Sequence, residues 1–573
     1  MYIDVVPNRS SRPAVLLREA SRDGKKILKR TLANLSDWPA EQVEALRRLL
    51  RGERLVPVSE LFAIERSLPH GHVQAVLGTI RRLSLERLIG SVRCRERDLV
   101  VAMIAERILH PDSKLATTRT WRASTLAEEL EVVDADVDEV YAALDWLLAR
   151  QRRVEKKLAA RHLTEGGVAL YDLSSSSYEG SHCSLARWGH NRDGEKLPCI
   201  AYGVLADREG RPVAMDVFPG NTGDPRAVVA QVERLQEEFG LRRVVLVGDR
   251  GLLTATQVEV LRDHPGLGWI SALRSHAIRD LVDSGALQRS LFDETNLAEI
   301  TSPEYPGERL VACFNPFLAE ERHRKRQELL EATERELRRL AGAVARRTRK
   351  QMTAAEIGVK VGQVINRHKM GKHFEVEIGA GALSWRRRTT AIEAEATLDG
   401  IYVVRTSEPA ETLGSGDVVR AYKSLAEVEL AFRCLKGIDL KVRPIFLRVE
   451  DHVRAHLFLC MLAYYVEWHM RQAWAPLLYE DEARRLDRAR RDPVAPAIPT
   501  PTARHKKSTH EGPDGFDLHS FRTLLHELAT LCRNRCRLMS DPTSPTFERL
   551  TDPTALQTKA FGLLQAVPMT AQP

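Results

Sequence analysis

The spacing of apolar and polar positions changes along the chain. It is typical of strands at the N-terminus and typical of helices over the longer stretch that follows. Residues 13–35 predict a β-hairpin, because two short apolar runs flank the turn dipeptide Asp23-Gly24 and the second run is rich in Lys and Arg. From residue 39 to 165 the apolar residues recur at helical spacing, and Pro39 stands where a helix would begin. We therefore expect a basic N-terminal β-hairpin (1–38) followed by a mostly helical region (39–165).

After residue 166 the pattern changes to short apolar runs of strand length. Runs at 168–173, 198–206 and 212–218 predict an antiparallel meander, and Asp224-Pro225 then predicts a helix that extends to about Phe239. A further strand, 243–248, ends at Asp249, and a helical crossover before it implies parallel pairing with an earlier strand. This order opens a ribonuclease-H-like α/β domain, in which the first and fourth strands are neighbours. Asp172 and Asp249 would then meet at one edge of the sheet.

The strand pattern is interrupted after 268–274 and resumes at 400–404. Between them lie strand-like pieces at 309–314 and 374–378 and a basic segment of helical composition. We therefore predict an α/β fold: a ribonuclease-H-like mixed-sheet core in two parts, 166–279 and 398–475, interrupted by an inserted domain of β-structure and basic helices, 280–397. Residues 476–573 are expected to form a Pro-containing linker and a C-terminal helical region.

A helical run, 418–436, offers a third acid. Tyr422, Leu425, Glu429, Phe432 and Lys436 are spaced by three or four residues and would share one face of a helix. Taken alone, Glu429 with Arg433 four residues later fits an ordinary surface ion pair. Two strand-end aspartates upstream favour the reading of Glu429 as a third carboxylate of the same site.

Charge and cysteine content narrow the class of protein. The 573-residue chain has a net charge of +8, which favours a polyanionic partner. Residues 322–350 contain eleven Lys or Arg against four Glu, and this segment either contacts such a partner or forms a solvated helical hairpin. The eight cysteines are scattered, as in a reducing compartment. Cys532 and Cys536 with His519 and His526 allow a zinc site, but apolar spacing over 521–528 favours an ordinary C-terminal helix.

No apolar run is long enough for a membrane span, and no export signal begins the chain, so we expect a cytoplasmic protein.

Taken in order, these motifs resemble the DDE transposases of bacterial insertion sequences, in the branch with a β-rich insertion in the catalytic core. That branch has a Tyr-x2-Arg-x3-Glu-x6-Lys signature, and Tyr422, Glu429 and Lys436 match it, whereas Leu425 stands at the Arg position. The resemblance extends over 168–470 and includes the segments 171–176, 205–212, 220–222, 249–251 and 440–445.

The resemblance implies DNA cleavage at element ends and strand transfer into target DNA, and we expect the transposition to be of the cut-and-paste kind. It implies Asp172, Asp249 and Glu429 as catalytic ligands of two Mg²⁺ or Mn²⁺ ions, with Asp172 bridging, and hard oxygen ligands suit these cations. The partners implied are double-stranded DNA, as terminal inverted repeats and target, and a second copy of the chain in a homodimeric synaptic complex. The expected place is the bacterial cytoplasm, on the nucleoid when the protein is bound to DNA.

Further residues are candidates for contacts with DNA. Near the acids these are Tyr422, Arg433, Lys436 and Arg250, and in the loop after the first strand they are Arg187 and Arg192, for which plain solvent exposure is the alternative. In the insertion, Trp385 could stack on a flipped base while Arg386, Arg387 and Arg388 hold flanking phosphates. The alternative is that Trp385 covers the small core of the insertion. His456, among apolar neighbours, is expected to be a core histidine.

Two other functions are compatible with these residues. One is a noncatalytic DNA-binding protein on the same fold, which would not need all three acids. The other is a two-metal nuclease that hydrolyses DNA without joining it. A sugar-kinase-like phosphotransferase is disfavoured, because no glycine-rich phosphate loop follows the first strand.

Overall fold

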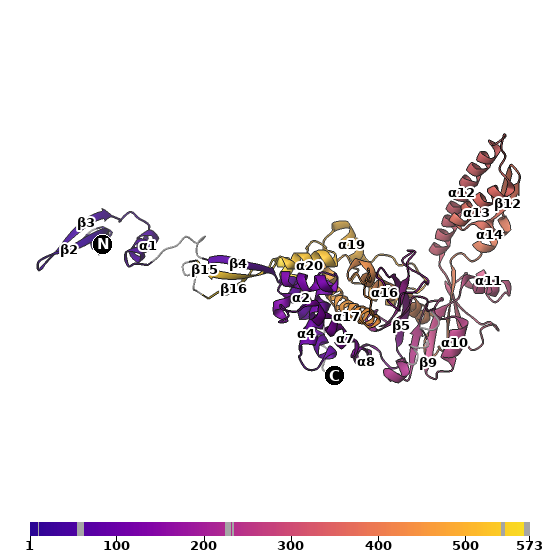
Figure 1. The fold of residues 1–573 in the computed structure, drawn as a ribbon, viewed down its shortest axis with the longest axis horizontal. Coiled ribbons are helices and arrows are strands. Elements are labelled where there is room, and N and C mark those ends of the chain that lie inside the picture. The colour runs from indigo at the N-terminus through magenta and orange to yellow at the C-terminus, as the bar shows by residue number, and fades with distance from the viewer. Residues whose placement is uncertain are drawn as a thin grey trace. The chain divides into compact units, whose positions relative to one another are not determined.

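The computed structural model describes residues 1–9, 11–53, 62–223, 228, 231, 234–539 and 545–565. It divides into two compact units (Figure 1). One unit consists of Met1–Pro69 with Leu531–Asp552, and the other of His70–Thr530 with Pro553–Pro573. This division differs from the boundaries expected from the sequence, because a segment near the C-terminus pairs with one from near the N-terminus.

The first unit contains two small antiparallel sheets. The predicted hairpin is present as β2 and β3, which pair up to Asp23 and Lys26 on either side of the turn. A further strand, β1, pairs with β2. The second sheet has the order β16-β15-β4. Cys532 and Cys536 therefore lie in a strand, β15, and not in the helix before it. The elements of this unit are β1 (Tyr2–Val6), β2 (Ala14–Asp23), β3 (Lys26–Asn34), α1 (Ala40–Leu50), β4 (Phe62–Pro69), β15 (Cys532–Leu538) and β16 (Phe547–Leu550).

The second unit begins with the predicted helical region. Its long helices α4 and α7 pack against the later helix α17 (Figure 1). The middle of α17 is buried on all sides. Burial of so many apolar side chains ties this region and the sheet into one hydrophobic core. The helices are α2 (Gly71–Arg82), α3 (Leu85–Ile89), α4 (Arg95–Leu109), α5 (Lys114–Thr120), α6 (Leu126–Glu129), α7 (Val137–Leu148), α8 (Gln151–His162) and the 3-10 turn η2 (Trp121–Ala123).

An eight-stranded mixed sheet forms the centre of the second unit. Its order is β10-β11-β14-β9-β8-β5-β6-β7, with β5, β6 and β7 antiparallel and β8 parallel to β5, as predicted. This α/β arrangement is consistent with a ribonuclease-H-like core. The strands are β5 (Val168–Ser177), β6 (Cys199–Asp207), β7 (Pro212–Pro219), β8 (Val244–Val247), β9 (Leu267–Ala272), β10 (Leu297–Ile300), β11 (Arg309–Phe314) and β14 (Ile401–Thr406).

The interruption of the sheet is shorter than predicted. β10 and β11, which fall within the expected insertion of 280–397, are strands of the main sheet, and β11 pairs directly with β14. Local spacing could not reveal this, because the pairing joins strands far apart in the chain. The segment between β11 and β14 has a small hydrophobic core of its own. It contains α12 (Pro316–Ala345), α13 (Ala354–His368), η5 (Gly371–His373), β12 (Phe374–Gly379), β13 (Ala382–Arg387) and α14 (Thr389–Ala396). Its helices α12, α13 and α14 and its strand β12 lie together beyond the main sheet (Figure 1).

The predicted helical run over 418–436 is divided into three pieces. α15 (Ser415–Lys423) ends at Ser424, α16 (Leu425–Arg433) follows, and a π-helical turn η6 (Cys434–Ile438) completes the run. The Ser424 hydroxyl donates a hydrogen bond to the carbonyl of Arg420 at 2.9 Å, which is a contact that bends helices. Tyr422 and Glu429 therefore lie on two successive helices, but the predicted face is kept across the break, because Tyr422, Leu425, Glu429, Phe432 and Lys436 all line one cleft.

The remaining helices surround the sheet and the helical region. They are α10 (Ala255–Arg262), α11 (Ser275–Asp283), η4 (Arg289–Phe292), α17 (Glu450–Trp474), η7 (Ala475–Leu477), α18 (Arg484–Arg490), α19 (Pro501–Thr509), α20 (Phe521–Ala529) and α21 (Ala555–Leu564). α20 confirms the helix predicted over 521–528. Of the helix predicted from Asp224, the start lies outside the described residues, and Arg234–Glu238 form a π-helical turn, η3. Within the described residues, no helix combines the length and the apolar character that a bilayer crossing requires.

Candidate active site

Asp172 and Asp249 lie at the same level of two neighbouring strands. In the parallel pairing of β5 and β8, Leu170 is opposite Val247, so Asp172 and Asp249 each follow that pair by two residues. Adjacent strands are about 4.8 Å apart, which brings the two side chains to one edge of the sheet. The β5–β8 pairing ends at Leu170, whereas β5 continues to Ser177 along β6, so the edge opens beside Asp172.

The backbone holds both aspartates in place. Asp249 Oδ1 accepts hydrogen bonds from the amides of Gly251 at 3.0 Å and Leu252 at 2.7 Å, which fixes the turn after β8. Asp172 Oδ1 accepts one from the amide of Leu173 at 2.8 Å. The carboxylates are therefore oriented by local hydrogen bonds before any ligand binds.

Glu429 reaches the same site from α16, which packs on β5. Its side chain is exposed, and it lines a cleft of about 540 Å³ together with both aspartates. The lining is Asp172, Ser174, Arg192, Asp249, Tyr422, Lys423, Leu425, Ala426, Glu429, Phe432, Arg433 and Lys436. Three carboxylates from three separate parts of the chain therefore share one cleft.

The pKa of Asp172 depends on its burial and on the charged groups around it. Burial raises the pKa of Asp172 to about 7, the Arg192 guanidinium at 3.9 Å opposes the rise, and the charges of Asp249 and Glu429 add to it. Carboxylates crowded in this way repel each other when ionised, and a divalent cation relieves the repulsion. The donors are all carboxylate oxygens, which are the ligands that Mg²⁺ and Mn²⁺ prefer. The residues present therefore fit such a metal.

Residues 165–466, more than half of the 573, match the family described as the transposase DDE domain. The chain belongs to this family of transposases. Residues 3–56 match the N-terminal domain of IS1634 family transposases, so both ends of the resemblance point to an insertion-sequence transposase. A search of curated proteins gives no match. The family implies phosphoryl transfer on DNA, and its members generally use divalent metals.

Leu425 occupies the position at which the sequence resemblance leads us to expect Arg. Its side chain is 8 % exposed and packs in the main hydrophobic core, while Arg433 is exposed and lines the cleft. This arrangement supports an interpretation in which Leu425 is a core residue and the nearby Arg433 supplies the cationic group that Leu425 lacks. Tyr422 also lines the cleft. Burial and the nearby charge of Asp249 raise the pKa of Tyr422 to about 12, so its hydroxyl is neutral and can donate a hydrogen bond.

Lys436 lies at the cleft but has protein partners that the sequence did not indicate. Its ammonium donates to the carbonyl of Ser175 and forms an ion pair with Asp193 at 3.2 Å. Asp193 is 4 % exposed at its side chain and also pairs with Arg443 at 3.0 Å. The backbone amide of Ser177 adds a hydrogen bond to Asp193 at 2.9 Å. These contacts with Ser175 and Asp193 fix Lys436 in the wall of the cleft. Its expected contact with a DNA phosphate stays a prediction.

The other arginines near the acids lie in different places. Arg192 lines the cleft and also a neighbouring hollow of about 460 Å³ that contains Trp188, a residue 70 % exposed. The backbone of Arg187 pairs with Cys199, and its side chain is exposed. Arg250 is exposed directly after Asp249, and its carbonyl accepts a hydrogen bond from Arg274 at 3.3 Å. Neither Arg187 nor Arg250 lines the cleft, and their contacts with DNA stay predictions.

Trp385 belongs to the small core of the insertion, the alternative that the sequence left open. Its ring meets Phe374 edge-on at 6.0 Å between centroids and packs with that core. Arg386 pairs with Glu375 at 2.8 Å, and Arg387 with Glu334 at 2.5 Å, so both guanidinium groups already have carboxylate partners. Arg388 precedes α14 as its N-cap residue and is exposed. Base stacking by Trp385 stays a prediction, and the structure gives it a packing role.

A second group of potential metal ligands lies away from the cleft. Cys434, Asp439 and Glu467 approach one another in the buried interior, the only such group among the described residues. Arg471 occupies the space with them, pairing with Asp439 at 2.6 Å and with Glu467 at 2.7 Å. The guanidinium neutralises these acids, so we interpret the group as a structural ion network. The Cys532 and Cys536 pair gives no such group among the residues that the structure describes.

Proposed function

We propose that this transposase cuts DNA at the ends of an insertion sequence and joins the cut ends to target DNA, using Asp172, Asp249 and Glu429 as ligands of two Mg²⁺ or Mn²⁺ ions. The observation that carries the proposal is that these three carboxylates line one cleft although they come from β5, the turn after β8 and α16. The family membership supports a role in DNA transposition.

The chain supplies positioned oxygen donors and a basic wall. Bound divalent ions in such a site activate the attacking oxygen and stabilise the leaving oxygen of an in-line displacement at phosphorus. Asp249 is held by two amides and Asp172 by one, so neither needs to reorganise before binding. Arg433 and Arg192, which line the cleft, are available to contact the charged phosphate.

The partners follow from the same proposal. The substrate is double-stranded DNA, as the terminal inverted repeats of the element and as target, and joining two ends requires two active sites. We therefore expect a homodimer in the synaptic complex. The basic helix α12 and the N-terminal hairpin offer cationic surfaces for sequence-independent contacts with the DNA backbone.

The test is a cleavage and joining assay on labelled element ends with Mg²⁺. Asp172→Asn, Asp249→Asn and Glu429→Gln are each expected to reduce cleavage about a thousandfold, because loss of a metal ligand removes several kcal/mol of transition-state stabilisation. Binding of uncut ends, measured without metal, should stay within a factor of a few. Glu427→Gln is the matched control, since Glu427 lies on α16 but pairs with Arg488 at 2.9 Å, outside the cleft lining.

The products distinguish the proposal from its rivals. Nicked and joined products support transposition by the three acids. Nicks without joined products in the parent protein would favour a nuclease, and near-normal cleavage by any one of the three variants would remove that residue from the ligand set.

A further inference from the structure

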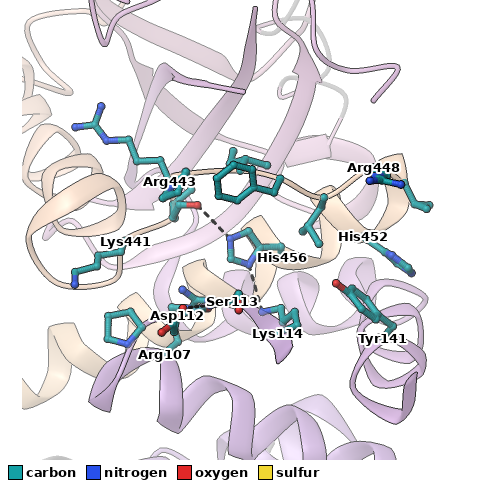
Figure 2. A pocket seen from close by; sticks show the side chains of 17 residues that line it. Arg107, Asp112, Ser113, Lys114, Tyr141, Lys441, Arg443, Arg448, His452 and His456 are labelled. Atoms are coloured by element: carbon teal, nitrogen blue, oxygen red, sulfur yellow. Dashed lines mark hydrogen bonds between the residues drawn. The ribbon is translucent and has the colours of Figure 1, made fainter. Parts of the chain in front are cut away.

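A second cavity, separate from the cleft of the three acids, lies between the helical region and the segment after η6. It has a volume of about 600 Å³, within the range of cavities that hold small ligands. Its walls come from the end of α4 and the start of α5, from Tyr141 on α7, from residues 441–449 and from His452 and His456 on α17 (Figure 2). The catalytic proposal uses none of these side chains as a ligand.

Two cations are buried at this cavity without an acid beside them. Lys114 and Arg107 are each 5 % exposed. The Lys114 ammonium contacts Nδ1 of His456 at 3.4 Å, and Arg107 donates to the backbone carbonyl of Asp112 at 2.8 Å (Figure 2). Among the described residues, no carboxylate lies within ion-pair distance of either cation. Asp112, the acid in the lining, is exposed, and its carboxylate accepts a hydrogen bond from the amide of Ser113 at 2.6 Å.

Such burial is costly unless a counter-ion is present. Burial lowers the pKa of Lys114 to about 7, and the charge of Arg107 lowers it further. Burial also holds the pKa of His456 well below its usual range, so this imidazole is neutral. A neutral His456 that donates from Nε2 to the carbonyl of Val442, at 3.3 Å, presents Nδ1 as an acceptor to Lys114. The cavity therefore lacks one negative charge at its inner end, and a bound anion would supply it.

The outer walls suit a planar, partly apolar group. The rings of Tyr141 and His452 are stacked, with centroids 4.8 Å apart and planes 21° apart. Phe446, which is 56 % exposed, and Pro444 line the same cavity. Tyr141 is half-buried, so Phe446 is the exposed ring of the two. Accessible aromatic faces beside cations are the arrangement on which unpaired bases stack. A nucleoside phosphate has both the anion and the planar ring that these walls fit.

The cavity is connected to the cleft of the three acids through side chains. Arg443, in the segment that lines the cavity, pairs with Asp193 at 3.0 Å, and Asp193 pairs with Lys436 at 3.2 Å in the wall of the cleft. A DNA strand that occupies the cleft therefore has a second basic site within the same unit.

We propose that this cavity binds one unpaired nucleotide, with its phosphate at Lys114 and Arg107 and its base against Tyr141 and Phe446. The chemistry is that of a nucleoside phosphate, whose source is either a DNA strand or a free nucleotide. The proposal rests on the DNA substrate of the proposed function, but not on cleavage by the three acids.

The test measures binding to the full chain in EDTA, so that no cleavage contributes. The probes are a labelled 5′-phosphorylated thymidine decamer, thymidine 5′-monophosphate and inorganic phosphate. Lys114→Met removes the charge and keeps the length of the side chain, and it should weaken decamer binding about ten- to a hundredfold, as loss of a charge-assisted hydrogen bond does. Lys156→Met, the same change at an exposed lysine of α8 outside the cavity, should leave binding unchanged.

A second readout locates the base. A decamer that carries 5-iodouracil should crosslink, on irradiation, to the peptide that contains Tyr141 or Phe446, and Lys114→Met should reduce that crosslink. Circular dichroism checks that the variant is folded, and Lys114→Gln repeats the test with a polar side chain. Equal binding by the parent and both Lys114 variants, with no crosslink to either peptide, would overturn the proposal.

The competitors identify the ligand. Displacement of the decamer by the mononucleotide but not by equal inorganic phosphate supports a nucleoside phosphate, and displacement by both at equal concentration overturns the role of the base. Decamer binding without mononucleotide binding assigns the cavity to a DNA strand, and equal affinity for the two assigns it to a free nucleotide. Lys114-dependent decamer binding by a parent protein that does not cut element ends would reject only the catalytic proposal.

Discussion

The buried amine of Lys114 makes the stability of this transposase depend on pH in a direction that the structure determines. The pKa of Lys114 is about 7 in the folded chain and 10.5 in the unfolded chain. Between these values the unfolded state binds one more proton, so the free energy of unfolding rises with pH from about 7 to about 10.5. At about 1.4 kcal/mol per pKa unit, this rise amounts to roughly 5 kcal/mol, of which about 3 kcal/mol falls between pH 7 and 9.5.

Lys114→Met removes the amine, so the variant should lose this rise. The neighbours do not titrate in the same way: Arg107 is a guanidinium, burial keeps the pKa of His456 far below neutrality, and burial raises the pKa of the Cys460 thiol. The difference between parent and variant therefore isolates Lys114. Lys114→Met should be the more stable protein near pH 6, and its advantage should shrink by a few kcal/mol as pH rises to 9.5.

The assay is urea unfolding of both proteins from pH 6 to 9.5, followed by tryptophan fluorescence. Trp121, which is fully buried directly after α5, reports on the region around Lys114. Since two units can unfold in separate steps, the transitions are compared between the two proteins under the same conditions. A stability difference that stays constant across this range would refute a depressed pKa at Lys114, and with it the missing negative charge of the cavity.

Two further changes test the interior of the second unit. Leu425→Arg should lower the free energy of unfolding by about 2–4 kcal/mol, because it replaces a packed apolar side chain with a charge; a variant with parental melting temperature and tighter DNA binding would contradict the core role of Leu425. Arg471→Leu should cost about 3–5 kcal/mol, since it leaves the carboxylates of Asp439 and Glu467 buried without their cation. Arg484→Leu, at a side chain 57 % exposed, is the control and should shift the melting temperature little, and equal shifts in both variants would argue against a buried network.

The sequence predicted the parts of the site that depend on local pattern. Strand-length apolar runs that end near Asp172 and Asp249, with a crossover between them, were sufficient to predict two neighbouring parallel strands, and β5 and β8 confirm it. The spacing of acids and apolar residues around Glu429 indicated a helix that presents this acid, and α16 is that helix. These inferences hold because periodicity follows from backbone geometry within one element.

Features that depend on contacts between distant segments were not predictable in the same way. β10 and β11 have the composition of short strands. They join the main sheet only because β11 pairs with β14, which comes after the inserted segment in the chain. The break at Ser424 depends on a single hydroxyl that bonds to a carbonyl one turn earlier. No periodicity contains this information, because a Ser in a helix can equally face solvent.

His456 shows how an interpretation can be correct locally and still miss the chemistry around it. Its apolar neighbours indicated a buried histidine, and the side chain is 6 % exposed. Its partner Lys114, however, lies 342 positions earlier in the chain, and the two meet only because α5 and α17 belong to one packed helical region. Nothing in the sequence indicates that a lysine at the start of a short helix is buried. Likewise, nothing in the sequence indicates that a core histidine lines a cavity. The fold brings Lys114, Arg107 and the neutral His456 together at one cavity, and Arg443, Asp193 and Lys436 link that cavity to the cleft of the three acids. The three acids are the part of the proposed chemistry that local pattern can reveal, whereas the proposed site at Lys114 depends on contacts that only the fold creates.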